Sequence, residues 1–182
     1  SRVALFGKLN NVGYKAIEGA TVFCKLRGNP YVEVVHWLHQ VLQLQNSDLH
    51  CIVRAFAMDP GKLARDITES LDRLPRGATS ISDLSPHIAD SVERAWVWAT
   101  LKYGDTQVRV GYLIVAMQKT PALKNLLSGI SREFDKIKVD QLTDDYDKIC
   151  AGSPEASLSA SDGTHFGGQA GPGEASDAIA PA

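Results

Sequence analysis

The sequence predicts an all-α domain in which a four-helix repeat is duplicated about a pseudo-twofold axis. Residues about 75 apart match: Leu9, Asn10, Ile17, Glu18, Ala20, Val22, Leu26 and Arg27 recur as Leu84, Ser85, Val92, Glu93, Ala95, Val97, Leu101 and Lys102. With the offset widened to 76, Val32, Val34, His36 and Leu38 fall on Val108, Val110, Tyr112 and Ile114. Two copies suit a doubled helical unit better than a solenoid, which needs three or more. No segment alternates apolar and polar residues long enough to predict a sheet.

The first repeat, residues 9–75, has helix boundaries marked by capping residues. Asn10 is a good N-cap for a first helix that Gly28 ends. Asp59 caps the fourth helix, with Pro60 at its first position. Between them, apolar spacing predicts a helix over about 33–45 and a short one over about 49–56. The fourth helix is expected to run to the break at Pro75.

The second repeat, residues 84–150, begins in the same way. Ser85 is the expected N-cap and Pro86 the first helical residue of a helix that ends near Gly104. Further helices are predicted over about 108–118, 121–128 and 132–149. The loop from Pro75 to Leu84 joins the two repeats.

Two segments lie outside the repeats. Residues 1–8 are expected to form a short extension helix that carries Val3, Leu5 and Phe6. Residues 151–182 include 22 Ala, Gly, Ser or Pro among 32 residues. Such a composition cannot bury enough surface to offset the entropy of ordering, so we expect a flexible linker to a missing ATPase region, in a chain that is the N-terminal piece of a longer protein.

Composition excludes several classes of function. Residues 1–150 carry 19 basic and 17 acidic residues, with no basic run among aromatics, which argues against nucleic-acid binding. Three cysteines without a close pair favour a reducing compartment, and we expect the cytoplasm. No apolar run approaches the length of a membrane span.

The order of the motifs resembles the Clp N-terminal domain, the substrate-receiving module of ring-forming AAA+ unfoldases. The resemblance covers about residues 9–149, from the Leu-Asn start at Leu9 through the Val-x-x-x-His-x-Leu stretch at Val32 to the Leu-x-Arg-Leu-Pro joint ending at Pro75 and the second copy. Within that family the amino-acid sequence at Leu5–Asn10 and Ala20–Glu33 is most similar to the ClpV group, the disaggregases of type VI secretion. One departure is Tyr112, which stands where the first copy has His36.

This resemblance implies a binding role rather than catalysis by this chain. ClpV proteins recognise an N-terminal helix of the large subunit of the contractile sheath, and their ATPase rings then extract sheath subunits for reuse. The full-length protein would be a hexamer that uses ATP and Mg. No phosphate-binding Gly-x-x-x-x-Gly-Lys-Ser/Thr loop occurs here, so hydrolysis would belong to the missing remainder. General substrate or adaptor binding in another unfoldase is the alternative.

A guest helix of this kind would need an apolar groove. An amphipathic extension should pack on the first helices of the two copies, and small Ala95 and Ala99 would leave room beside it. The residues expected to line the groove are Leu5, Phe6, Leu9, Ile17, Ile88, Val92 and Tyr112. For Ile17 and Val92 an ordinary core position is equally compatible with the pattern, whereas Phe6 lies outside the repeats that build the core.

Two catalytic alternatives are weaker. Glu33, His36 and His39 share one predicted helix, but their spacing matches no closed metal-ligand set, and an independent helical metalloenzyme is therefore the less favoured hypothesis. Ser85 and Ser131 are expected to be helix caps rather than nucleophiles.

Overall fold

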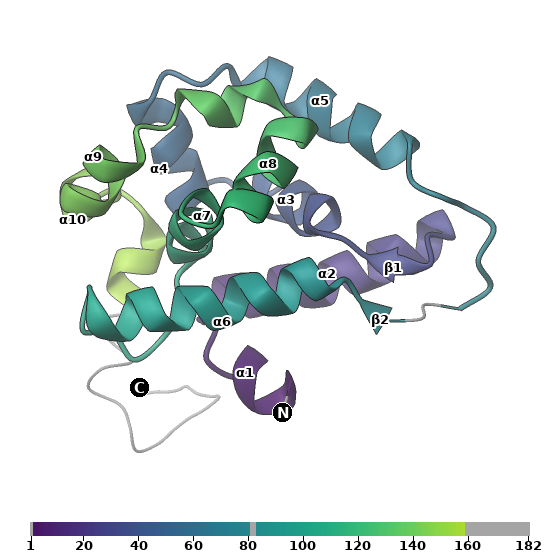
Figure 1. The fold of residues 1–182 in the computed structure, drawn as a ribbon, viewed down its shortest axis with the longest axis horizontal. Helices are drawn as coiled ribbons and strands as arrows, with labels where there is room; N and C mark the ends of the chain where they lie inside the picture. Colours follow the sequence, from purple (N-terminus) through teal and green to yellow (C-terminus); the bar gives the residue numbers. More distant parts are fainter. Residues whose placement is uncertain (1, 81–82, 159–182) are drawn as a thin grey trace.

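The helices of the two repeats pack around a shared core in the computed structural model, which describes residues 2–80 and 83–158 (Figure 1). The first half contains α1 (Arg2–Phe6), α2 (Asn11–Arg27), α3 (Val34–Leu42), α4 (Asp48–Ala55) and α5 (Pro60–Asp72). The second half contains α6 (Pro86–Leu101), α7 (Val110–Gln118), α8 (Pro121–Ile130), the 3₁₀-helix η1 (Arg132–Lys136), α9 (Val139–Asp144) and α10 (Tyr146–Ile149). The strands β1 (Tyr31–Val32) and β2 (Asp83–Leu84) have two residues each.

The predicted capping residues begin and end these helices. The Asn10 side chain accepts a hydrogen bond from the Gly13 amide at 2.9 Å, and Gly28 ends α2 with a φ of 70°. Asp59 accepts from two amides at the start of α5, and Ser85 accepts from the His87 amide at the start of α6. The starts of α2, α5 and α6 are thus set by local chemistry.

The repeats exchange short backbone pairings across the pseudo-twofold axis. β1 pairs in parallel with β2, so that Val32 lies opposite Leu84, while Leu9 forms an isolated parallel bridge with Val108. Leu9 and Leu84 are equivalent in the two repeats, as are Val32 and Val108. Each repeat therefore binds its partner's entry segment, which confirms the duplication and shows that the two copies interlock.

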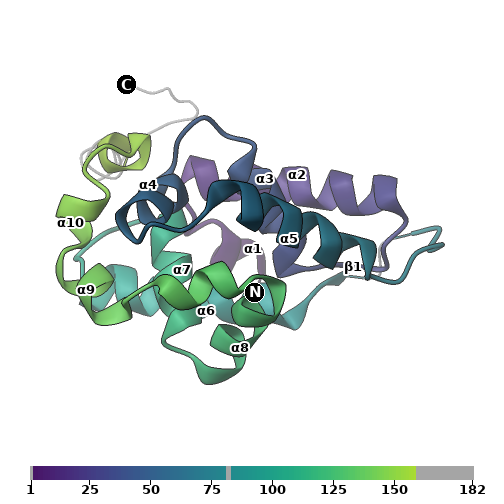
Figure 2. The ribbon, with the colours of Figure 1, turned by 90° about the horizontal axis from the view of Figure 1, so that it is seen from above.

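The central layer of the fold is made by the equivalent helices α3 and α7. α2 packs on α3 and α6 packs on α7 (Figures 1 and 2). Every residue of α7 is buried, which accounts for its continuous apolar sequence. None of the described helices has the length and apolar character needed to cross a membrane.

The structure corrects the prediction of one helix over 132–149. This segment forms η1, α9 and α10, with extended backbone at Ile137 and a break at Asp145. Two long-range contacts keep the segment from forming one continuous helix. Glu133 accepts from the Asp59 amide at 2.7 Å, and the Tyr146 hydroxyl donates to Asp48 at 2.6 Å.

The structure also corrects the expectation that a linker begins at Ala151. Residues 154–158 are helical, and Ser153 and Glu155 are buried. Glu155 anchors this segment through hydrogen bonds to the helix starts, which composition alone does not reveal. The rest of the expected linker, residues 159–182, lies outside the described residues.

Candidate functional site

An apolar hollow lies between α2 and α6, above α3 and α7. The hollow is small, with a cavity volume of about 10 Å³, and its lining residues are all buried, at most 8% exposed. The lining residues come from all four helices: Ile17, Val34, Trp37, Ile88, Ser91, Val92, Leu113 and Met117.

The hollow lies close to the pseudo-twofold axis, because equivalent residues line it from both sides. Ile17 on α2 and Val92 on α6 are equivalent at an offset of 75, and Trp37 on α3 and Leu113 on α7 at an offset of 76. Duplication has thus placed the two outer helices side by side over the two central ones. The result is a site with apolar walls and an apolar floor.

The polar groups in the lining are few. Ser91 donates its hydroxyl to the His87 carbonyl at 2.6 Å, so its hydrogen is already used within α6. Trp37 is buried, and its Nε1 has no hydrogen-bond partner among the described residues. A space of this size holds about one water molecule, so the lining side chains pack mainly against one another.

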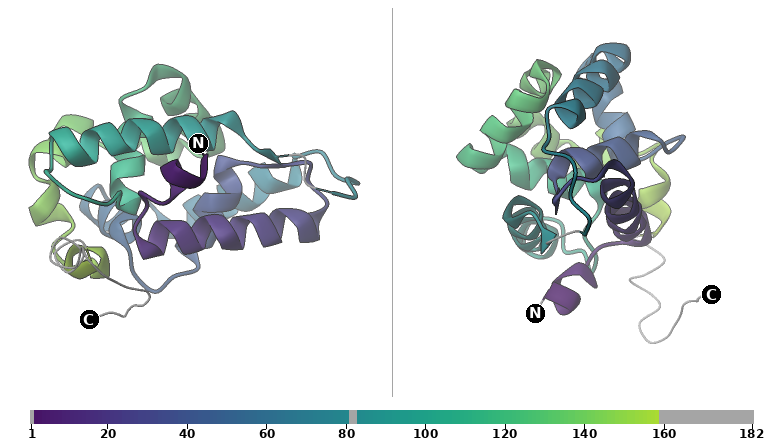
Figure 3. Two further views of the ribbon diagram at one scale, coloured as in Figure 1. Left: turned by 90° about the horizontal axis from the view of Figure 1, so that it is seen from below. Right: turned by 90° about the vertical axis from the view of Figure 1, so that its right-hand side faces the viewer.

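Helix α1 lies on the same face, packed on α6 and leading into α2 (Figure 3). Phe6 and Leu9 are buried in the core cluster, and Leu5 packs against that cluster while remaining partly exposed. Lys8 places its Nζ 4.8 Å from the centre of the Trp96 ring on α6. α1 is therefore anchored rather than free.

The structure brings together only some of the residues predicted for the groove. Ile17, Ile88 and Val92 lie beside the hollow as buried core residues, and their contact with a guest stays a prediction. Leu5, Phe6 and Leu9 belong to α1 and the turn after it, and Phe6 is a core residue instead of an exposed anchor. The sequence prediction missed the floor, Val34, Trp37, Leu113 and Met117, although the equivalence of Trp37 with Leu113 was a signal that could have located it.

Tyr112 lies apart from these residues. It is 3% exposed, and its ring stacks on that of Tyr103 with the centroids 4.7 Å apart. Its hydroxyl donates to Asp105 at 2.9 Å. Burial and the neighbouring Asp105 carboxylate raise the pKa of Tyr112 well above its usual range.

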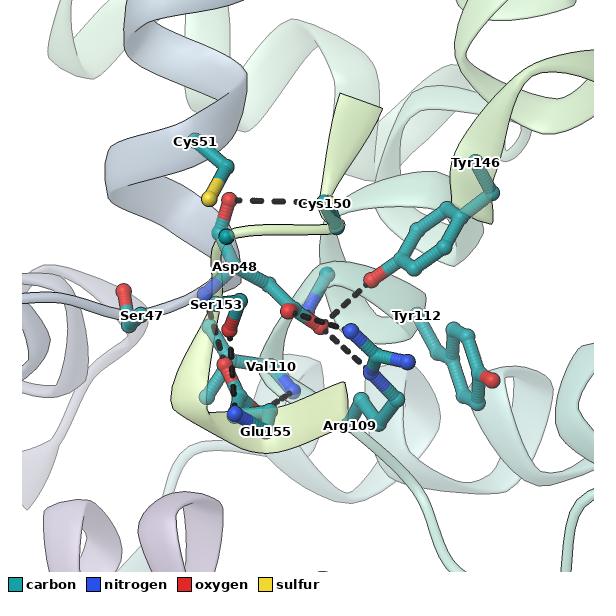
Figure 4. A network of polar contacts seen from close by, with 12 residues as sticks. Ser47, Asp48, Cys51, Arg109, Val110, Tyr112, Tyr146, Cys150, Ser153 and Glu155 are labelled. Atoms are coloured by element: carbon teal, nitrogen blue, oxygen red, sulfur yellow. Dashed lines mark hydrogen bonds and ion pairs between the residues drawn. The ribbon is translucent and has the colours of Figure 1, made fainter. Parts of the chain in front are cut away.

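A buried polar network occupies the other side of α7 (Figure 4). Arg109 donates to both carboxylate oxygens of Asp48, at 2.9 and 2.8 Å, and Tyr146 and the Gly111 amide donate to the same carboxylate. Burial raises the pKa of Tyr146 and that of the Cys150 thiol. The carboxylate oxygens of Asp48 already accept four hydrogen bonds, and the nearby hydroxyl and thiol are held protonated. This network therefore supports structure and offers no activated nucleophile.

The predicted metal candidates make other contacts. His36 accepts the Glu33 amide at Nδ1 and donates from Nε2 to Asn29 at 2.8 Å, while His39 stacks on Phe23 with centroids 4.4 Å apart. Burial lowers the pKa of His36 to about 4. Within the part of the chain that the structure describes, no group of three or more His, Cys, Asp or Glu side chains is placed to hold a metal ion.

Comparison with known proteins identifies the family. Residues 8–130 match the model of the Clp repeat (R) N-terminal domain. The AAA+ ATPase ClpV1 of Pseudomonas aeruginosa is 62% identical over 181 residues, which is 100% of this chain and 20% of that protein. The chaperone protein ClpB of Yersinia enterocolitica is 47% identical over 179 residues, 98% of this chain and again 20% of that protein. The chain thus spans about a fifth of the length of the curated relatives it matches.

Solved structures agree with this assignment. One, from work on the ATPase ClpV, the TssB-TssC sheath and the accessory HsiE protein of type VI secretion, is 62% identical with a TM-score of 0.84, covering 85% of this chain and 96% of that one. Another, described by a peptide of the SciI protein from the EAEC Sci1 type VI secretion system, is 26% identical with a TM-score of 0.75, covering 84% and 96%. A complex of a ClpV N-domain with a VipB peptide shares the fold at 20% identity, with a TM-score of 0.73 and coverage of 85% and 94%. The chain belongs to the Clp repeat (R) N-terminal domain family, in its ClpV group.

Proposed function

We propose that this domain is the substrate-recognition module of an ATP-dependent disaggregase, and that it binds an N-terminal helix of the large contractile-sheath subunit of type VI secretion. Contracted sheath would then be disassembled and recycled. The domain itself would bind and not catalyse. ATP and Mg would be used by the rest of a full-length hexamer, in the cytoplasm.

The observation that carries the proposal is the 62% identity to ClpV1 along the whole of this chain. The solved relative of equal identity comes from work that couples ClpV to the TssB-TssC sheath, and more distant structures with the same fold are described by a SciI peptide and by a complex with a VipB peptide. These relatives make a sheath segment the favoured guest.

Helix-in-groove recognition at this site would require α2 and α6 to separate, because the residues between them are now at most 8% exposed. An amphipathic guest helix presents apolar side chains at i, i+3, i+4 and i+7, and these need an apolar cleft between helices. α2 and α6 supply the sides through Ile17 and Val92, and α3 and α7 supply the floor through Trp37 and Leu113. α1, anchored on α6, would border the guest at one end.

A second candidate is general substrate or adaptor binding, as in another Clp-type unfoldase. It is favoured by the 47% identity to a protein described as the chaperone ClpB. The same hollow would serve, but it would accept unrelated apolar segments with similar affinity. Selectivity for the sheath helix therefore separates the two candidates.

The test is fluorescence anisotropy with a labelled peptide from the N-terminal helix of the cognate large sheath subunit, titrated with the 182-residue chain. We expect saturable binding with a Kd near 1 μM, which corresponds to about −8 kcal/mol. A scrambled peptide of the same composition should bind at least about tenfold more weakly, a difference of about 1.4 kcal/mol. Equal binding of both peptides would favour the general chaperone, and no binding of either would overturn the groove proposal.

A matched pair of variants locates the guest. Ser91→Val adds one methyl group, about the size of the space, and Thr100→Val removes a hydroxyl on the same helix away from it. Both hydroxyls donate to a carbonyl four residues earlier, so both variants lose the same kind of hydrogen bond. Ser91→Val should weaken peptide binding while Thr100→Val retains it, with circular dichroism confirming that both are folded.

A further inference from the structure

Glu155, in the helical segment 154–158 after the second repeat, is fully buried, with an exposed fraction of 0%. Its Oε1 accepts from the Asn10 side-chain amide at 2.9 Å and from the Val110 backbone amide at 2.7 Å, and its Oε2 accepts from the Asp48 backbone amide at 2.7 Å. Figure 4 shows the carboxylate beside Val110 and Asp48. Three donors thus converge on one side chain.

Each donor stands at the start of a different helix. Asn10 is the N-cap of α2, Asp48 is the first residue of α4, and Val110 is the first residue of α7. The first amides of a helix lack partners within the helix and carry partial positive charge, which a carboxylate satisfies. One side chain therefore ties together helices from both repeats.

Two of these three helices form the hollow. α2 contributes Ile17, and α7 contributes Leu113 and Met117. Asn10 also donates its backbone amide to the Val108 carbonyl at 2.9 Å, so α2 and the segment before α7 meet at the point where Glu155 binds. A displacement of the Glu155 carboxylate would move the starts of α2 and α7, which contribute residues to opposite sides of the groove.

We infer that Glu155 is a positioning residue for the groove, and that the segment 153–158 sets the spacing of α2 and α7 through this carboxylate. This inference rests on the proposed function. The segment lies after the second repeat, and its carboxylate reaches helix starts of both repeats.

Glu155→Gln tests the inference. Gln has nearly the size of Glu, but its side-chain NH2 group replaces one acceptor oxygen and would face an N–H donor instead of accepting from it. The matched control is Glu133→Gln. Glu133 is also buried and also accepts a helix-entry amide, that of Asp59 at 2.7 Å, but the helix it caps is α5, which does not line the hollow.

Two readouts go beyond stability. With the labelled sheath-subunit helix as probe, Glu155→Gln should weaken binding by about five- to tenfold at a temperature where both variants are folded, and Glu133→Gln by less than twofold. Without any peptide, methyl NMR signals of Ile17 and Leu113 should shift in Glu155→Gln and stay in place in Glu133→Gln.

A second variant protects the test if Glu155→Gln does not fold. Asn10→Ser places at this N-cap the residue type that the second repeat has at the equivalent Ser85. It removes only the side-chain donor to Glu155. Asn10→Ser should shift the same methyl signals and weaken binding of the peptide at least twofold. Unchanged signals and unchanged affinity in the folded variants would overturn the inference while leaving the proposed function in place. Shifted signals in Glu155→Gln, together with a wild type that binds no peptide, would support the positioning role and overturn the proposed function instead.

Discussion

Tyr112 donates its hydroxyl to Asp105 at 2.9 Å, at the positions where the first repeat joins His36 to Asn29 at 2.8 Å. Both pairs are separated by seven residues and related by the offset of 76. The two members of the pair have therefore changed together: an imidazole facing an amide has become a phenol facing a carboxylate. The duplication has kept the hydrogen bond while replacing both partners.

Tyr112→Phe should lower the free energy of unfolding by about 1 to 2 kcal/mol, because it removes this hydrogen bond and leaves the Asp105 carboxylate without that donor. Tyr31→Phe, on an exposed side chain, should change it by less than about 0.5 kcal/mol. Urea unfolding followed by circular dichroism measures both. Equal effects of the two substitutions would mean that the pair contributes nothing to stability.

Local chemistry made much of the fold predictable. Asn10, Asp59 and Ser85 announced helix starts because their side chains satisfy the first free amides, and each does so in the structure. The repeat offset predicted the duplicated architecture, and it also explains the paired entry segments at Leu9 and Leu84.

Long-range contacts made the rest unpredictable. Glu155 and Asn10 are 145 residues apart, and nothing in an Ala-, Gly- and Ser-rich tail distinguishes one buried glutamate from a solvated one. Apolar helix spacing marks Ile17, Ile88 and Val92 as an inner face, and all three are buried core residues, while their contact with a guest stays a prediction. The groove prediction also named Tyr112, which lies apart from the hollow. The match between the repeats does not show which inner residues lie at the hollow and which face the buried polar network.

Gly111→Ala should strongly destabilise the domain. A methyl group there would overlap the Tyr146 hydroxyl, which is held by Asp48 and cannot move away without breaking that hydrogen bond. We expect a loss of about 2 to 4 kcal/mol, typical of severe overpacking in a core.

The matched control for Gly111 is Gly129→Ala. A methyl group at this helical position meets nothing within 4 Å, so better helix propensity should make it neutral or stabilising by up to about 1 kcal/mol. Thermal unfolding of both variants compares the two outcomes. A Gly111→Ala variant as stable as Gly129→Ala would show that Tyr146 does not pack against α7.

Acid should weaken the fold through His36. Burial lowers its pKa from 6.5 to about 4, so the folded protein binds fewer protons than the unfolded chain between these values. The stability this group provides is complete above pH 6.5 and is lost as the pH falls through about 4, by about 2 to 3 kcal/mol. Unfolding free energies of wild type and His36→Gln should therefore converge on acidification, because Gln cannot be protonated. Curves that stay parallel from pH 7 to pH 4 would contradict a neutral buried His36.

Glu155 should act in the opposite direction. Burial, and then the charge of Asp48, raise its pKa from 4.5 to about 7, although the three N–H donors oppose this. The folded protein then binds more protons than the unfolded chain between these values, so the stability that Glu155 provides is complete below pH 4.5 and falls as the pH rises through about 7. The advantage of wild type over Glu155→Gln should shrink by about 2 to 3 kcal/mol from pH 4.5 to pH 8. Where the two titrations overlap, between about pH 4.5 and 6.5, the losses at His36 and the gains at Glu155 offset each other, and wild type should show a flatter pH dependence than either single variant. A constant difference between wild type and Glu155→Gln at pH 5 and pH 8 would mean that Glu155 stays ionised throughout, held by its three donors.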